Sequence, residues 1–291
     1  MDSSWGNYCV IDGAEFSRRD WRETIDGGQA FTWFETDTPD EYCGVFSGVA
    51  ARVRLDESGK LRAAFPKDAD QKKCACALAE YLDTKTDYRL IRAALENSGD
   101  ENMRKALQLY PTLRILRQNP AEAIIGFICS SSKRIVQIKQ CVRLLSEKFG
   151  EEIGCGLHAL PTFETLANAD LDAILACKLG FRAKYLLDTA RKITADNFDP
   201  IELREMDYPC AKKYLTSLSG VGEKVADCIL LFGCSRLEAF PVDTWIKQAM
   251  HDLYATGHDP KKIRQFAAQK FPHYAGFAQQ LLFAAKRNNF I

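Results

Sequence analysis

The segment from residue 210 to residue 250 holds the residues whose types and spacing are best suited to chemistry. Within it, Ser219-Gly220-Val221-Gly222 separates two amphipathic runs, and its two glycines allow a tight hairpin without a Cβ penalty. Free amide N–H groups and the helix dipole would then form an anion site suited to a DNA phosphate. Taken alone, the pattern favours an ordinary αα-hairpin with glycine at a helix end.

A lysine and an aspartate flank the helix that follows this break. Lys224 lies in its first turn, where the positive end of the helix dipole disfavours a charged amine, and a nucleophilic amine must be neutral. Asp243 follows 19 residues later, directly before another helical run that it can cap. A nucleophilic lysine and an aspartate that stabilises positive charge on a sugar form a credible site for cleaving a glycosidic bond. For Asp243 alone, a plain helix cap is an equally good interpretation.

The rest of the chain must supply a fold that positions these residues. Its 291 residues are 46% hydrophobic and 27% charged, which predicts a folded protein of roughly two domains. No apolar run approaches the ~20 residues that span a bilayer, and the first residues lack the pattern of a signal peptide. The 11 cysteines are therefore expected to be reduced thiols in the cytoplasm rather than a disulfide framework.

The formal net charge of zero hides an uneven distribution. Residues 1–110 carry 15 basic and 20 acidic side chains, whereas residues 111–291 carry 24 basic and 19 acidic ones. A basic face can bind phosphates even when the whole chain is neutral. Such clusters are more often solvated helix faces, so charge alone is weak support for a nucleic-acid partner.

The hydrophobic pattern predicts an α+β fold, with an N-terminal antiparallel sheet and a mostly helical remainder. Residues 42–55 and 61–65 have the pattern of antiparallel strands around a turn, and residues 27–34 have strand-like spacing. From about residue 69 the pattern is helical, with helix-start signals at Asn119-Pro120 and at Asp199-Pro200-Ile201-Glu202.

Two domains follow from this pattern. We expect a sheet domain with flanking helices over residues 1–115 and a helical region over residues 116–291. A helix-hairpin-helix is expected at about residues 210–233.

Five further motifs lie in order along almost the whole chain. They are Gly28-Gln29-Ala30-Phe31-Thr32-Trp33, Arg117-Gln118-Asn119-Pro120, Phe127-Ile128-Cys129-Ser130-Ser131, Gly180-Phe181-Arg182-Ala183-Lys184-Tyr185 and Tyr274-Ala275-Gly276-Phe277-Ala278-Gln279 followed by Phe283. Together with Leu218 to Asp243, they resemble the 8-oxoguanine DNA glycosylases of the helix-hairpin-helix superfamily. Several ordered matches are far more specific than any single motif. The loop Ser132-Lys133-Arg134 is closer to bacterial than to animal members.

The resemblance implies a base-excision repair enzyme that removes 8-oxoguanine and then nicks the abasic site. Lys224 would attack the anomeric carbon, expel the base and form a Schiff base from which β-elimination follows. Asp243 would stabilise the oxocarbenium-like charge and orient the amine. The target nucleotide would be extruded from the duplex into a pocket, because its reacting carbon is shielded there.

The resemblance also assigns contacts to the flipped base, and the C-terminal helix would complete its pocket. Cys228 and Phe283 would contact the two faces of the base. Gln279 would bind its Watson–Crick edge, and the Gly28 carbonyl would bind the ring N–H that distinguishes 8-oxoguanine from guanine. Taken singly, Cys228 and Phe283 are more typical of core packing, Gly28 of a turn and Gln279 of a helix surface.

Several residues would bind DNA outside the base pocket. They are Ser132, Gln137, Arg182, Gly220, Val221, Gly222 and Trp245. Arg182 would bind the cytosine opposite the lesion. Taken alone, it is more simply interpreted as a solvent-exposed arginine. Ser132 and Gln137 stand where animal enzymes carry asparagine and a second arginine, which predicts a weaker preference for cytosine. Thr244-Trp245 replaces a histidine that the animal enzymes carry soon after the aspartate that matches Asp243, and Trp245 either packs against the DNA backbone or belongs to the core.

The alternatives are a related glycosylase and a module that only grips DNA. The endonuclease III branch often carries an iron–sulfur cluster, but the last cysteine here is Cys234, so we expect no such cluster, no metal and no required cofactor. Alkyladenine-type glycosylases lack the lysine, and a non-catalytic module leaves Lys224 and Asp243 together unexplained. The expected partner is duplex DNA containing oxidised guanine, bound by a cytoplasmic monomer without membrane contact, near the nucleoid if bacterial.

Overall fold

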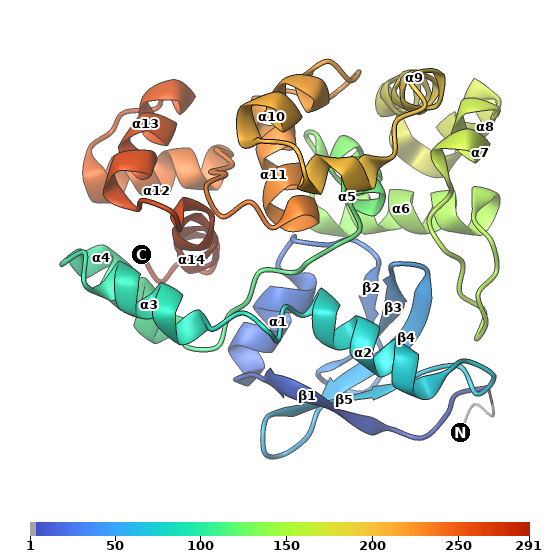
Figure 1. Ribbon diagram of the computed structural model, residues 1–291, viewed down its shortest axis with the longest axis horizontal. Helices are drawn as coiled ribbons and strands as arrows, with labels where there is room; N and C mark the ends of the chain where they lie inside the picture. Colours follow the sequence, from blue (N-terminus) through green and yellow to red (C-terminus); the bar gives the residue numbers. More distant parts are fainter. Residues whose placement is uncertain (1–3) are drawn as a thin grey trace.

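The computed structural model describes residues 4–291, which form a five-stranded antiparallel sheet followed by a helical region (Figure 1). The strand order in the sheet is β1-β5-β4-β3-β2. The strands are β1 (Cys9–Glu15), β2 (Trp33–Glu35), β3 (Glu41–Phe46), β4 (Val49–Leu55) and β5 (Lys60–Ala64). The predicted α+β class is therefore confirmed.

The hairpin of β3 and β4 follows directly from the local sequence of its turn. Ser47 and Gly48 both have positive φ and join β3 to β4 through a two-residue hairpin, the turn whose twist matches that of the strands. The helices α1 (Arg18–Asp26) and α2 (Gln71–Tyr81) bury Trp21 and Tyr81 in the core of the sheet. Burial of these large aromatic side chains is the main contribution to the stability of this layer.

The prediction of strand-like structure over residues 27–34 is mostly wrong. Helix α1, which the sequence did not reveal, ends there, with the Gly27 N–H donating to the Glu23 carbonyl. Gly28 has a φ of +98°, a conformation that side chains rarely adopt, so the chain makes an irregular loop. Pairing with β3 begins only at Trp33. The loop of residues 27–32, called the glycine loop below, is thereby free to approach the helical region.

Helices make up most of the remainder, and they surround one hydrophobic core. Two short elements are not α-helical, namely the π-helix η1 and the 3₁₀ helix η2. The elements are α3 (Tyr88–Glu96), α4 (Glu101–Leu109), α5 (Pro120–Ser130), α6 (Ile135–Phe149), α7 (Phe163–Ala167), α8 (Leu171–Ile174), η1 (Leu175–Leu179), α9 (Arg182–Ala195), η2 (Pro200–Arg204), α10 (Tyr208–Thr216), α11 (Glu223–Cys234), α12 (Thr244–Tyr254), α13 (Pro260–Lys270) and α14 (Ala275–Arg287).

Both predicted helix-start signals are present. Asn119 caps α5 with its side chain and is followed by Pro120 in the first turn. Asp199 and Glu202 form a capping box, although the element that it starts is η2 rather than an α-helix. The buried helix α5 then packs along α11, which places it directly behind the predicted catalytic lysine.

The C-terminal helix α14 lies beside α12 and α13 and packs against α4 and α12 (Figure 1). The Tyr110 hydroxyl donates to the Ala284 carbonyl at 3.0 Å, and the side chains of Ile91 and Met103 enter the same core as α14. Helices α3 and α4 therefore pack with the helical region, although they precede residue 115 in the chain. A division of the chain near that residue stays a prediction.

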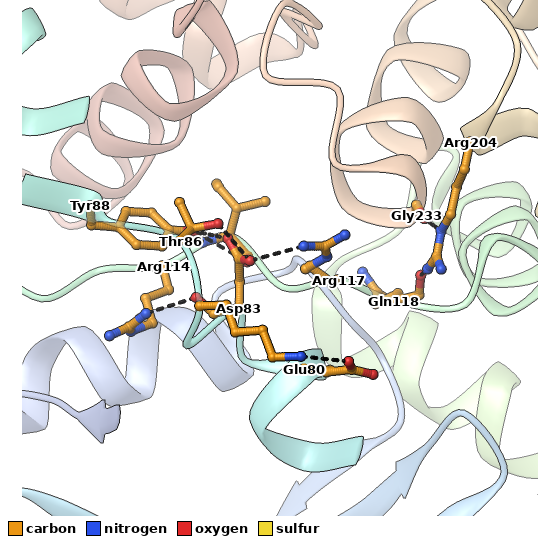
Figure 2. Close-up of polar contacts among 11 residues, drawn as sticks. Glu80, Asp83, Thr86, Tyr88, Arg114, Arg117, Gln118, Arg204 and Gly233 are labelled. Atoms are coloured by element: carbon orange, nitrogen blue, oxygen red, sulfur yellow. Dashed lines mark hydrogen bonds and ion pairs between the residues drawn. The ribbon is translucent and has the colours of Figure 1, made fainter. Parts of the chain in front are cut away.

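Residues 110–119, the segment between α4 and α5, are fixed by a polar network with the end of α2 and the start of α3 (Figure 2). Asp83 accepts hydrogen bonds from Thr86 and Tyr88 and pairs with Arg117, and Arg114 donates to the Asp83 carbonyl at 2.9 Å. Each charged or polar group there has a partner, as buried polar groups require. The segment is therefore held in one position relative to the sheet.

The same segment is also tied to α11 and to the glycine loop. Arg204 donates to the carbonyls of Gln118 and Gly233, at 2.8 and 3.2 Å, and so links it to the end of α11 (Figure 2). The Gln118 amide donates to the Gln29 carbonyl at 2.6 Å. These contacts fix the glycine loop relative to the helix that carries Lys224.

Over residues 4–291, no helix has both the length and the apolar character needed to cross a membrane.

Candidate active site

The predicted hairpin is formed by α10 and α11 with a tight turn between them. Gly220 has a φ of +77°, and a Cβ at this position would lie 2.7 Å from the Tyr185 side chain, so only glycine fits. Val221 is buried and anchors the turn in the core. Gly222 is the N-cap of α11 and has no side chain to accept from the first amides of the helix. Those N–H groups are therefore available to an anion.

Lys224 lies in the first turn of α11, as predicted, and is half-buried. Its amine is 5.8 Å from the centre of the Phe127 ring and forms no ion pair with any residue in the part of the chain that the structure describes. The amine is therefore not held by a carboxylate, and it lies in the wall of a cavity that a substrate can enter.

Asp243 has both functions that its position allows. It is the N-cap of α12, where one carboxylate oxygen accepts from the Ile246 N–H at 2.8 Å, and it also lines the same cavity as Lys224. Burial raises the pKa of this carboxyl group, while the Ile246 N–H and the charge of Lys224 act in the opposite direction. The interpretation as a helix cap is correct, and it does not exclude a part in the chemistry.

The cavity has a volume of about 410 Å³, within the usual range for small-molecule sites. Helices α5, α6, α11 and α14 and the glycine loop form its walls. Seven of the predicted site residues line it, namely Gly28, Lys224, Cys228, Asp243, Trp245, Gln279 and Phe283. Residues distant in sequence are thus brought together as the resemblance implies.

Cys228 and Phe283 lie in the cavity wall on different helices. Cys228 is one turn beyond Lys224 on α11, and burial raises the pKa of its thiol to about 11, so it is protonated near neutral pH. Phe283 is half-buried on α14. Both side chains therefore offer neutral surfaces against which a planar base can pack.

The Gly28 peptide is held on both sides. Arg287 donates to the Gly27 carbonyl at 3.1 Å and pairs with Glu23 at 2.6 Å, whereas Gln118 occupies the Gln29 carbonyl. A Cβ on Gly28 would lie 3.1 Å from the Ile135 side chain, in addition to the strain of its positive φ. The two neighbouring carbonyls are thus occupied, and the direction of the peptide between them is fixed.

Gln279 is buried rather than exposed on a helix surface. Only 4% of its surface is accessible, its Nε2 donates to the Pro241 carbonyl at 3.2 Å, and its Oε1 has no hydrogen-bond partner in the part of the chain that the structure describes. A buried acceptor without a hydrogen bond lowers the stability of the protein, so such groups are rare. One in the wall of a cavity is suited to accept a hydrogen bond from a bound ligand. The interpretation of this residue as a surface glutamine is therefore wrong.

The remaining predicted DNA contacts lie outside the cavity lining. Arg182 is only 5% exposed, so the interpretation as a solvated arginine is wrong. Its guanidinium donates to the carbonyls of Ser131 and Leu179, and it lies 4.1 Å from the ring centre of Phe181, a side chain that is 58% exposed. Arg182 thus joins the end of η1 to the segment that follows α5.

Ser132 lies in the loop between α5 and α6, and Gln137 lies in the first turn of α6. Ser132 has a φ of +53°, which is unusual for a residue other than glycine. The Gln137 Oε1 accepts from the Arg134 N–H at 3.1 Å and so caps the start of α6. Trp245 is 41% exposed at the edge of the cavity, so it does not belong to the core.

Twelve further residues of the cavity wall were not among the predicted site residues. They include Phe31, Phe127, Gln280 and Arg287. Phe31 and Phe127 lie inside motifs that were identified for other reasons, and their rings pack edge to face at a centre distance of 5.3 Å. Arg287 follows Phe283 by one helical turn, a spacing that would have placed both on one face of α14.

No cluster of three or more His, Cys, Asp or Glu residues that could hold a metal ion occurs within residues 4–291. The eleven cysteines, all of which lie in this range, are free thiols.

Comparisons with known proteins agree with this geometry. Residues 15–124 match the N-terminal domain family of 8-oxoguanine DNA glycosylase, and residues 125–273 match the HhH-GPD superfamily of base excision DNA repair proteins. A probable N-glycosylase/DNA lyase of Methanothermobacter thermautotrophicus is 29% identical over 282 residues, which cover 88% of this chain and 89% of that protein.

Solved structures give the same result. The Clostridium acetobutylicum 8-oxoguanine glycosylase/lyase, in complex with double-stranded DNA containing cytosine opposite 8-oxoguanine, has a TM-score of 0.85 and 32% identity. The match covers 99% of this chain and 100% of that one. A 3-methyladenine DNA glycosylase of Archaeoglobus fulgidus, at 20% identity and a TM-score of 0.76 over 97% of this chain and 99% of that one, shares the fold. The chain therefore belongs to the 8-oxoguanine DNA glycosylase family of HhH-GPD base-excision repair proteins.

Proposed function

We propose that the protein removes 8-oxoguanine from duplex DNA by attack of the Lys224 amine and then nicks the abasic site. Membership of the 8-oxoguanine DNA glycosylase family assigns the reaction, which is N-glycosylase and DNA lyase chemistry in base-excision repair. The observation that carries the residue roles is the convergence of six side chains or peptides on one cavity. These are Gly28, Lys224, Cys228, Asp243, Gln279 and Phe283.

In the proposed reaction, the neutral Lys224 amine attacks C1′ of the extruded nucleotide. The N–C1′ bond forms as the bond from C1′ to the base breaks, and the base leaves with the electron pair and takes up a proton. Loss of an amine proton and opening of the sugar ring give a Schiff base. Removal of a proton from C2′ then expels the 3′ phosphate, which nicks the strand. Splitting the reaction through a covalent intermediate lowers the barrier of each step.

Asp243 stabilises the positive charge that develops on the sugar as the base departs. Its carboxylate is held in the cavity by the hydrogen bond from the Ile246 N–H, so it need not reorient during the reaction. A fixed charge of opposite sign in a partly buried site is an effective form of transition-state stabilisation. The charge of Lys224 favours the ionised form of Asp243, which supports a close relation between the two groups.

Recognition of the base uses the neutral walls of the cavity. The base lies between Cys228 and Phe283, and the unpaired Gln279 Oε1 accepts from its Watson–Crick edge. The Gly28 carbonyl accepts from the N7–H of 8-oxoguanine, whereas guanine presents a lone pair there and is repelled. The occupied carbonyls on either side of Gly28 support this role, because they limit the peptide to one orientation.

Trapping with borohydride on 8-oxoguanine DNA tests this proposal. Reduction of the Schiff base would yield a stable covalent adduct between protein and DNA. A helix-hairpin-helix module that only binds DNA would yield none, although it would bind the same duplex. Absence of the adduct, with binding retained, would overturn the role of Lys224 as the covalent nucleophile.

The proposed chemistry uses an amine, a carboxylate and neutral base contacts from this chain, so it calls for no cofactor. The proposed partner is duplex DNA that contains oxidised guanine, bound by a monomer. We place the protein in the cytoplasm, at the nucleoid in a bacterium, because free cysteines are typical of a reducing compartment.

Binding to DNA should depend strongly on salt. The free amides at the start of α11 and the basic side chains of the helical region are proposed to contact phosphates, and each contact releases counterions. We expect the affinity for a lesion duplex to fall roughly tenfold or more between 50 and 200 mM salt. Fluorescence anisotropy over a salt series measures this, and a flat response would contradict the phosphate contacts.

Excision should show only a modest preference for cytosine opposite the lesion. Ser132 offers one short hydroxyl, and the oxygen of the Gln137 amide is already engaged by Arg134. Arg182 is the main remaining reader of the orphan base, and three of its five N–H groups are already engaged by the carbonyls of Ser131 and Leu179. Each lost contact is worth on the order of 1–3 kcal/mol of discrimination, so the preference should weaken by about one decade or more.

Single-turnover excision from duplexes with each of the four opposite bases measures this preference. We expect 8-oxoguanine to be removed opposite adenine, thymine and guanine as well as cytosine. Ser132→Asn combined with Gln137→Arg should sharpen the preference. If the unmodified protein already excises strictly opposite cytosine, another residue reads the orphan base and the assignment is wrong.

A further inference from the structure

A second glutamine next to Gln279 lines the cavity and has no assigned role. Gln280 is only 2% exposed and lies in the cavity wall formed by α14, and its Nε2 has no hydrogen-bond partner among residues 4–291. Buried side-chain amides in folded proteins are almost always hydrogen-bonded, because water is no longer available to them. A buried and unpaired amide in the wall of a binding cavity is typical of a group that is paired only when a ligand is bound.

The position of Gln280 on α14 places it beside the proposed base. It precedes Phe283 by three residues, so the two side chains are neighbours on one face of the helix. Gln279 is adjacent in sequence and also lines the cavity. A base that packs against Phe283 while its Watson–Crick edge faces Gln279 therefore lies within reach of Gln280.

The two glutamines offer complementary groups. The Gln279 Nε2 is occupied by the Pro241 carbonyl, so its free atom is an acceptor and suits the N1–H and N2–H₂ donors of 8-oxoguanine. The adjacent O6 of the base is an acceptor and needs a donor. Gln280 is a residue of the same wall, and its Nε2 is a buried, unpaired donor. The Arg287 guanidinium, another cation in this wall, is already engaged by Gly27 and Glu23.

We propose that Gln280 is a second base-contacting residue, which donates a hydrogen bond from its amide to O6 of the flipped 8-oxoguanine. The proposal rests on the function proposed above. It adds a polar contact to the Watson–Crick edge that uses a group paired with nothing in the DNA-free protein. The contact would favour bases with a carbonyl oxygen at position 6, because a buried donor without an acceptor is costly.

The test compares Gln280→Met, which keeps the length of the side chain without its polar atoms, with Gln280→Glu, which replaces the donor by an acceptor. We expect single-turnover removal of 8-oxoguanine to fall about tenfold in Gln280→Met and further in Gln280→Glu. Nicking of a preformed abasic site, where no base fills the cavity, should change less than about twofold. Gln269→Met, at an exposed position of α13, is the matched control and should match the unmodified protein.

A substrate change isolates the contact with O6. Replacing O6 of 8-oxoguanine by sulfur keeps N1–H and N2–H₂ but leaves a weak acceptor. The unmodified protein should remove this base more slowly than 8-oxoguanine, whereas Gln280→Met should show a much smaller difference between the two. Removal of the 2-amino group, which addresses Gln279 instead, should affect both proteins equally.

Two results would overturn the contact. Either Gln280→Met removes 8-oxoguanine at the rate of the unmodified protein, or it loses abasic-site nicking to the same extent as base removal, as general disruption of the cavity would cause. Failure of the proposed function has a different signature. In that case the unmodified protein itself would give no borohydride adduct and no base release.

Discussion

Replacing Lys224 by glutamine is expected to abolish both base release and Schiff-base trapping while specific binding to lesion DNA is kept. Lys224 is half-buried in the first turn of α11, with its amine 5.8 Å from the Phe127 ring centre, so glutamine fits the same space and can still approach a bound nucleotide. It has no nucleophilic amine, however. Loss of an essential covalent nucleophile typically lowers the rate by several orders of magnitude.

Three measurements on the Lys224→Gln protein decide this. Single-turnover kinetics report base release, borohydride reports the covalent intermediate, and anisotropy reports binding. Lys73→Gln, at an exposed position of α2 in the sheet domain, is the matched control and should behave like the unmodified protein. Near-normal turnover by Lys224→Gln would remove this residue from the mechanism.

The residues that the sequence revealed most clearly are those governed by local rules. Gly220 requires a positive φ, and Asp243 and Asn119 are N-caps, each of which depends on a few neighbouring residues. The position of Lys224 in the first turn of α11 follows from the same rules. Local patterns of this kind are stable against changes elsewhere in the fold, which is why the conformations and helix positions of these residues could be predicted.

Features that depend on tertiary packing could not be predicted in this way. The glycine loop has the composition of a strand, but it turns away from the sheet because Gln118 and Arg287 bind its carbonyls from distant parts of the chain. The buried Arg182 guanidinium is bound by the Ser131 carbonyl, which lies 51 residues away in the sequence. In each of these cases a partner lies many residues away, and no local pattern encodes it.

Gln280 shows the same limit for a functional residue. In the sequence it is one of two adjacent glutamines on an amphipathic helix, where a polar side chain is ordinary. Its significance comes from being buried and unpaired in a cavity wall, which depends on the return of α14 to face α11. Missing hydrogen-bond partners are thus a signal that only the folded chain can give.

Asp243→Asn is expected to fold and bind lesion DNA but to remove the base far more slowly. Asparagine is as good an N-cap as aspartate, so the hydrogen bond from the Ile246 N–H and the start of α12 should be kept. The amide is neutral and cannot offset positive charge on the sugar. Removing one electrostatic contact to a transition state typically costs about 10²–10³ in rate. Single-turnover base release measures this loss directly.

The pH profile distinguishes a charge effect from a structural one. Because burial raises the pKa of Asp243, its carboxylate should begin to take up a proton at a higher pH than an ordinary aspartate as the solution is acidified. As the pH is lowered, the rate of base release by the unmodified protein should therefore begin to fall at a pH above the usual pKa range of aspartate. The rate of Asp243→Asn should not show this fall. Asp259→Asn, at the N-cap of α13, changes the same group in the same structural role away from the cavity and should leave the rate and its pH profile intact. An unchanged chemical step in Asp243→Asn would reduce Asp243 to a helix cap, because the cap is the only function that both side chains can perform equally.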